Sequence, residues 1–288
     1  MIFRPRSSPL HAARAAVASG WCVALALLAL TLEHPLLLVV VLATVLAAAG
    51  AARVLTPVVR ATAWALPFAL VIAGINAIVS RDGLTVILWG PELPGLGRLD
   101  ITAEALAYGA VLGLRAVVVI ACFALHSAAV DPDALLRGVR RLGVRSALTV
   151  AVSMRLVGLL ARDARRFHDA QRSRGGGAPP RTAVVRAVAV NALDRAGDVA
   201  ATLEIRGYAD SRRAPAGSRR PWSRHDLAFA LAGTALGVLA VAVAWLGLDP
   251  YEPYPLTHAP VDAGVTALAG VALALGLLPF ADRRGIGA

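Results

Sequence analysis

The sequence predicts an all-α, polytopic helical membrane protein with long amphipathic helices on its cytoplasmic side. Of its 288 residues, 58% are hydrophobic and the mean hydropathy is +0.67, whereas a soluble domain is roughly half apolar. Several apolar runs reach 18 residues, which is long enough to cross a hydrocarbon core of about 30 Å. These runs are continuous and do not alternate with polar residues, so a membrane β-barrel is not expected.

Charge divides the chain into three regions. All 29 basic residues are arginine, and the net charge is +11. Residues 131–224 hold 19 arginines and eight acidic residues, whereas the remainder holds ten of each. Because basic segments of membrane proteins stay in the cytoplasm, we expect residues 131–224 to be cytoplasmic. Residues 1–130, with about four spans, and 225–288, with one or two, are then the regions within the membrane.

The apolar runs predict up to six spans with both ends of the chain inside. Short arginine-bearing segments fall on the same side as the basic region, and the loops on the other side are neutral or acidic. The first run is interpreted as a retained span, because it is long for a signal peptide and lacks a small-residue cleavage site. Whether 261–280 forms a sixth span stays open. The expected spans are 15–32, 35–52, 61–79, 104–130, 226–248 and 261–280.

Three further features of the membrane regions are expected. Residues 80–103 are rich in glycine and proline and are expected to form an external loop, in which 84–89 is apolar enough to be re-entrant. Within the third span, Pro67 is expected to kink a helix whose neighbours tolerate the break. In the fourth span, Gly109 and Gly113 form a small-residue pair that permits close helix packing.

Three more helices are expected within 131–224. The first, 131–142, starts at Asp131-Pro132-Asp133, a capping acid followed by proline and a first-turn acid. The second, 145–174, stops at a run of three glycines. The third, 182–206, is rich in alanine, and its Ala196 and Ala200 are expected to let the second helix cross closely.

The second and third helices end in similar short motifs. These are Ser173-Arg174-Gly175 and Ile205-Arg206-Gly207, with their arginines 32 positions apart. An arginine followed by glycine is also an ordinary helix ending, because the cation complements the helix dipole and glycine allows the closing turn. Two such endings in one cytoplasmic segment favour a further role. An arginine held at a rigid tip presents a charged donor fork that suits an acidic groove on a partner.

Polar residues within the spans are few. Arg115 lies inside the fourth span and is a candidate functional residue; the structural alternative is an ion pair or bonds to backbone carbonyls. Cys22 and Cys122 lie in apolar spans and are expected to be buried thiols rather than a disulfide. The six histidines show no helical ligand spacing, so no metal site is predicted. The spans hold almost no acidic residues, which argues against a membrane enzyme.

The sequence resembles the transmembrane T component of energy-coupling factor (ECF) transporters, a family that includes the Q-type subunits of cobalt importers. The resemblance covers nearly all of the first 250 residues. It rests on the two arginine–glycine endings, the run from Leu203 to Tyr208, residues 101–106, Arg115 and the Asp131-Pro132 pair. Ser173 and Ile205 replace the alanine of the family's Ala-Arg-Gly motif. Val157-Gly158 stands where the family often has proline, and the sixth span lies beyond the usual pattern.

This resemblance implies a multi-pass subunit of the cell membrane, with no catalytic residue, metal or cofactor of its own. Each tip arginine would bind one of two ABC ATPase subunits, a homo- or heterodimer. A small substrate-binding membrane subunit would complete an importer of vitamins or transition-metal ions. The chain contains no P-loop, so ATP hydrolysis would belong to the partners. Substrate, stoichiometry, and whether the substrate-binding subunit is dedicated or shared, stay open.

One alternative function is a membrane scaffold whose basic segment binds anionic lipid or another partner. Such binding needs clustered charges without fixed positions. Here the arginines interleave with aliphatic and small residues along helices, which favours helix packing and docking, and no nucleic-acid partner is predicted. Contact with the lipid bilayer is expected in either case.

Overall fold

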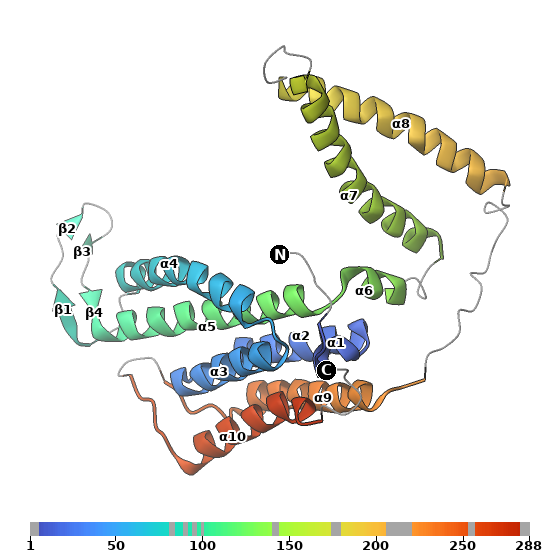
Figure 1. Cartoon of the computed structure of the whole chain (residues 1–288). Helices are drawn as coiled ribbons and strands as arrows, with labels where there is room; N and C mark the ends of the chain where they lie inside the picture. Colours follow the sequence, from blue (N-terminus) through green and yellow to red (C-terminus); the bar gives the residue numbers. More distant parts are fainter. Residues whose placement is uncertain are drawn as a thin grey trace. The chain divides into compact units, whose positions relative to one another are not determined.

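The computed structural model describes residues 6–80, 84–88, 92–93, 97–98, 101–139, 144–173, 180–205, 221–252 and 257–282. The chain divides into two compact units, shown in Figure 1. The first comprises residues 1–134 and 221–288, and the second comprises residues 135–220. The two units are described separately below.

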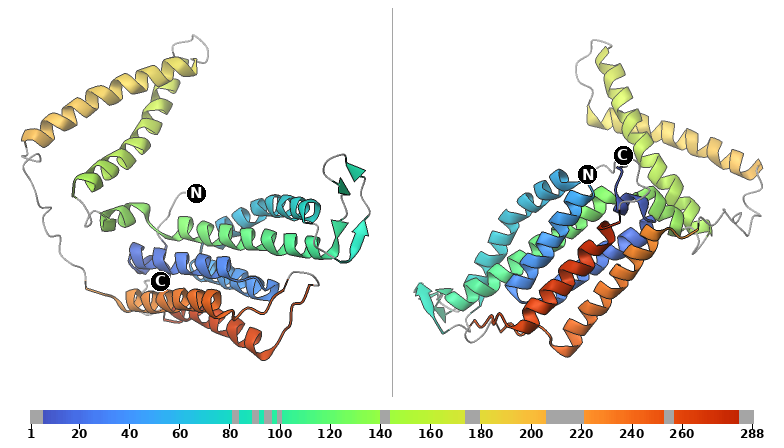
Figure 2. Two further views of the ribbon diagram at one scale, coloured as in Figure 1. Left: turned by 180° about the vertical axis from the view of Figure 1, so that it is seen from behind. Right: turned by 60° about the horizontal axis from the view of Figure 1, so that its bottom comes forward.

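The first unit is a bundle of long apolar helices with α2 (Ala15–Thr31) and α3 (Pro35–Ala51) in its middle. Helix α5 (Ala103–Ala129) packs against both of them, and α4 (Leu55–Val79) packs mainly on α5. On the other side, α9 (Arg224–Leu246) packs on α2, and α10 (Ala263–Leu277) packs on α3, as the views in Figure 2 show. The short helices α1 (Pro9–Ala12) and η1 (Leu278–Phe280) contact α9 at one end of this bundle.

Local sequence signals explain where these helices begin. The Thr102 hydroxyl accepts the backbone N–H of Ala105 at the start of α5. At the start of α9, Ser223 and Asp226 form a reciprocal capping box. Asp262 caps α10 by accepting from Val265. Each cap satisfies backbone donors that the first helical turn leaves without partners, so these residues set the helix starts.

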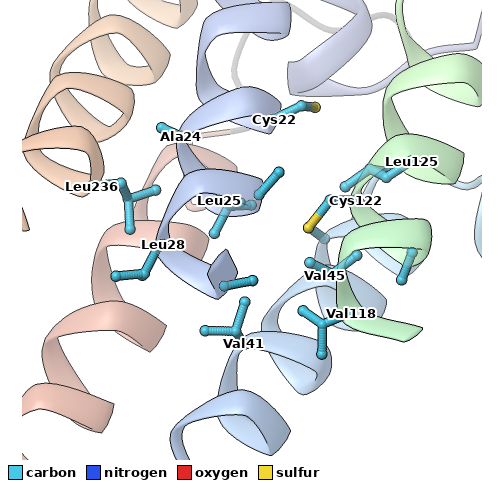
Figure 3. Close-up of a cluster of buried hydrophobic side chains, with 14 of the residues drawn as sticks. Cys22, Ala24, Leu25, Leu28, Val41, Val45, Val118, Cys122, Leu125 and Leu236 are labelled. Atoms are coloured by element: carbon cyan, nitrogen blue, oxygen red, sulfur yellow. The ribbon is translucent and has the colours of Figure 1, made fainter. Parts of the chain in front are cut away.

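The bundle core is aliphatic and tightly packed. Figure 3 shows Leu25 of α2 near Val41 and Val45 of α3, while Leu28 of α2 lies beside Leu236 of α9 and side chains of α5 complete the cluster. Cys22 and Cys122 belong to the same core; both are free thiols with 2% exposure, which confirms the expected buried thiols.

Aromatic rings pack at one end of this core. The Trp21 ring lies edge-on to Phe229 and Phe280, with centroids 5.5 and 5.6 Å apart. Phe229 and Phe280 also contact each other edge-on at 5.2 Å. Such edge-to-face pairs add to the packing of the aliphatic side chains, and here they join α2, α9 and η1.

Small residues allow two of the helix pairs to approach closely. A Cβ atom at Gly113 would lie 2.7 Å from the Ala69 carbonyl oxygen, and one at Gly109 would lie 2.8 Å from that of Ala73. On α9, a Cβ atom at Gly233 would lie 3.2 Å from the Cα atom of Trp21. The small-residue pair predicted in the fourth span is therefore confirmed as the contact between α4 and α5.

Among the residues that the structure describes, four helices are long and apolar enough to cross a membrane. They are α4, α5, α9, and α10 continued by η1. Helices α2 and α3 are apolar and 17 residues long, at the lower limit for a span. Helix α4 begins six residues before the expected span and runs unbroken through Pro67. The chain is thus a polytopic helical membrane protein, and the six-span topology with both ends inside stays a prediction.

The loop between α4 and α5 contains short strands that the sequence analysis missed. Strand β1 (Val86–Leu88) pairs antiparallel with β4 (Ile101–Thr102), and β2 (Glu92–Leu93) pairs with β3 (Gly97–Arg98). The apolar run within 84–89 therefore supplies a strand next to α5. The Glu104 carboxylate accepts the backbone N–H of Thr85 at 3.2 Å, which ties β1 to the start of α5.

The second unit consists mainly of two long helices, α7 (Val144–Ser173) and α8 (Arg181–Ile205). The shorter α6 (Pro132–Val139) lies at the division between the units. The Asp131 carboxylate accepts the backbone N–H of Asp133 at 3.0 Å, so the predicted start of this helix is confirmed. The bounds of all three helices lie within a few residues of the expected ones.

Candidate functional site

The two tip motifs stand at the ends of α7 and α8. Ser173 is the last residue of α7, and its hydroxyl donates to the carbonyl of Asp169 at 2.9 Å. Ile205 is the last residue of α8, and 86% of its surface is exposed. The other four motif residues lie outside the described residues: Arg174, Gly175, Arg206 and Gly207. The docking role of the motifs stays a prediction.

The described residues of the two motifs, Ser173 and Ile205, are set apart by the length of α8. Helix α8 begins at Arg181, a short connection after Ser173, and turns back across α7 at an open angle (Figure 1). From Arg181 to Ile205 it extends for about 36 Å at the usual helical rise. The described ends of the two motifs, Ser173 and Ile205, therefore lie toward opposite ends of the helix pair.

A buried polar group joins the two helices where they cross. Asp163 of α7 is 7% exposed, and its Oδ2 atom accepts from the Asn191 side chain at 3.3 Å and from Arg195 at 3.2 Å. Arg195 also forms an ion pair with this carboxylate, and its own side chain is 38% exposed. Beside this link, a shallow groove of about 500 Å³ lies between the helices, lined by Phe167, Ala183, Arg186, Ala187, Val190, Asn191 and Asp194.

The alanines chosen as packing residues lie elsewhere on α8. Ala196 and Ala200 are both exposed, whereas Ala187, nearer the start of the helix, lines the groove against Phe167. The α8 residues that the hydrogen bonds and the groove place at this contact, such as Ala187, Asn191 and Arg195, all precede Ala196. The packing role of Ala196 and Ala200 stays a prediction.

Arg115 binds backbone and acid at the end of a neighbouring helix. Its NH2 atom donates to the carbonyl of Leu32 at 2.8 Å and lies 3.9 Å from the Glu33 carboxylate. Leu32 is the residue that closes α2, so the cation sits where the helix dipole is negative. This arrangement matches the structural alternative given for Arg115, a bond to a backbone carbonyl beside an ion pair.

Two aspartates that the sequence analysis did not select fix both ends of α2 against α9. At one end, buried Asp226 accepts the backbone N–H of Arg14 at 2.7 Å and pairs with its guanidinium at 3.3 Å. At the other end, Asp249 accepts the backbone N–H groups of Glu33 at 2.6 Å and His34 at 2.9 Å. The two helices therefore run parallel, with one carboxylate at each end.

The chemistry that these residues offer is recognition and positioning. Within the ranges that the structure describes, no group of three or more His, Cys, Asp and Glu side chains gathers as it would around a metal ion. The features that stand out are a charged link between two long helices and the C-terminal residues of those helices, Ser173 and Ile205, at which the two sequence motifs begin.

Most of the chain matches a known protein family. The model of a family described as CbiQ, cobalt transport protein, matches residues 6–215, which include α2 to α8 and both tip motifs. None of the curated proteins compared with the chain matches it.

Proposed function

Since the chain belongs to the CbiQ family of cobalt transport proteins, the transmembrane component of ECF transport systems, we propose that it is the coupling subunit of an importer. In this role it links two cytoplasmic ABC ATPase subunits to a small substrate-binding membrane subunit. The imported substrate is a transition-metal ion or a vitamin. The chain itself carries no catalytic step and resides in the cell membrane with α7 and α8 in the cytoplasm.

The observation that carries this proposal is the placement of the two arginine–glycine motifs. They follow the ends of one pair of helices, and those ends lie tens of ångströms apart, which suits one contact on each of two ATPase subunits. Arg174 and Arg206 are the contact residues in this proposal. Arginine keeps its charge when desolvated and offers a rigid fork of donors to an acidic groove.

The test is co-purification of the ATPase subunits with variants of the chain. Truncating one partner of a buried, hydrogen-bonded charge pair at an interface costs on the order of 2–5 kcal/mol. We therefore expect Arg174→Ala and Arg206→Ala each to weaken ATPase binding, and the double variant to abolish binding and transport while still inserting. Lysine at either position should restore binding poorly, because it lacks the fork.

Matched controls are Arg172→Ala and Arg181→Ala, which remove exposed arginines next to the first tip. Both controls should retain the ATPases. Full retention by the double variant Arg174→Ala, Arg206→Ala would refute the proposed docking. Failure of the unaltered chain to bind any ATPase, together with binding to anionic vesicles, would favour the scaffold function instead.

A further inference from the structure

The second unit is held together in an unusual way for a pair of long helices. Among the side chains of α7 and α8 that the structure describes, Asp163 alone is buried. An apolar side chain would ordinarily fill such a position, because an unpaired buried carboxylate is costly. Here two donors from α8 offset that cost, so the contact is polar at its centre.

The geometry of the bonds makes this contact selective. Asn191 and Arg195 lie one helical turn apart on α8, and both donate to the same oxygen of Asp163, its Oδ2 atom. Sliding α8 by one turn, or swinging it far from its present angle, would break at least one of the two bonds. Buried polar groups are best attested as devices that select one register between helices.

The link also has a symmetrical place in the pair. Ser173 lies ten residues after Asp163 on α7, and Ile205 lies ten residues after Arg195 on α8. Both arms are therefore about 15 Å long at the usual helical rise. Because the helices run in opposite directions through the contact, the arms extend from it to opposite sides.

From these observations we propose that Asp163, with Asn191 and Arg195, is the fulcrum of the α7–α8 pair and a positioning site for both arginine tips. A change of about 10° in the crossing angle would move the end of each 15 Å arm by roughly 3 Å. The link thus sets the spacing of the tips at rest and passes a displacement of one tip to the other. The effect on transport rests on the proposed coupling function, whereas the effect on the spacing of the two helix ends can be tested on the chain alone.

The first measurement is the distance between spin labels at Gln171 and Ala201, both exposed and each close to one tip. It uses the full chain in lipid nanodiscs, with Cys22 and Cys122 replaced by alanine. We expect a narrow distance distribution for the unaltered pair and a broader, shifted one for Asp163→Ala. Asp163→Asn, which keeps the shape but removes the charge, should give a smaller change of the same kind.

Two further variants make the measurement specific. The exchange Asp163→Arg with Arg195→Asp should narrow the distribution again relative to either single change. Asp198→Ala removes an exposed carboxylate three residues after Arg195 on α8 and should leave the distance distribution unaltered. An unaltered distribution for both Asp163→Ala and Asp163→Asn, or an exchange no narrower than the single variants, would overturn the inference.

The second measurement is the ratio of substrate imported to ATP consumed by the full complex in proteoliposomes. A loss of folded protein lowers both quantities together and leaves their ratio constant. Misplaced tips should lower the ratio several-fold in Asp163→Ala while the ATPases stay bound, because Arg174 and Arg206 are intact. An unaltered ratio for Asp163→Ala would refute the proposed role of Asp163 as the fulcrum. Failure of the unaltered chain to bind ATPases would instead refute the coupling function and leave the distance result standing.

Discussion

Replacing Gly113 by alanine tests the close packing between α4 and α5. The added Cβ atom would lie 2.7 Å from the Ala69 carbonyl oxygen and 3.2 Å from the Ala69 Cβ atom. The nearest of these atoms belongs to the backbone of α4, so no side-chain rotation can relieve the contact and the helix itself must shift. Overpacking of this kind costs typically about 1–3 kcal/mol. The higher helix propensity of alanine offsets up to about 1 kcal/mol.

We therefore expect Gly113→Ala to lose about 1 kcal/mol of unfolding free energy, and Gly113→Val to lose more. For a chain of this size, 1 kcal/mol corresponds to a melting temperature lower by roughly 2–4 °C. The assay is thermal unfolding of the purified chain in detergent. Gly74→Ala is the matched control, because Gly74 lies on α4 and a Cβ atom there would meet nothing within 4 Å. Equal melting temperatures for the two alanine variants would refute the reasoning.

Two other predictions concern a carboxylate at a helix start and the membrane topology. The Asp226 carboxylate accepts from the backbone N–H of Arg14, the Arg14 guanidinium and the backbone N–H of Ser223. Asp226→Ala leaves these three donors without their partner, so we expect it to lower the unfolding free energy by on the order of 1–3 kcal/mol, measured by thermal unfolding. Asp262→Ala removes only a local cap, and a loss as large as that of Asp226→Ala would contradict the cross-helix role. In cysteine-free protein, cysteine at position 95 should react with an impermeant reagent from outside and cysteine at position 178 should not. External labelling at position 178 would show that the predicted topology is wrong.

Much of the fold could be predicted because its signals are local. Apolar runs, prolines and capping acids lie next to the helix ends they specify, as at Asp131, where the cap bonds within two residues. Arg115 could be assigned a carbonyl or acidic partner on chemical grounds, and Leu32 and Glu33 are such partners. The strands within 86–102 were missed because β1 is only three residues long and pairs with β4 across a glycine- and proline-rich loop.

The contacts between distant segments could not be predicted in the same way. Asp226 is a plain capping residue by sequence, and its bonds to Arg14 join positions more than 200 residues apart. Asp163 lies in the charged half of an amphipathic helix, where a carboxylate is expected to face water. The one available signal was that Asp163 and Arg195 are separated by 32 positions, the same spacing as the two tip arginines. This shared spacing indicates a contact between Asp163 and Arg195 only once the helices are known to run antiparallel.

The two units fix their helices in different ways, and this difference bears on which part can move. Helix α2 is fastened to α9 by Asp226 at one end and to the segment after α9 by Asp249 at the other, with a packed core between them. Sliding or tilting α2 against α9 would break one of these sets of bonds. Within the described parts of α7 and α8, the two helices share one polar link near the middle of the pair, and the other side chains are exposed or half-buried. Since regions with few buried contacts open at the lowest free-energy cost, motion in the proposed coupling cycle is expected in the α7–α8 pair, about Asp163.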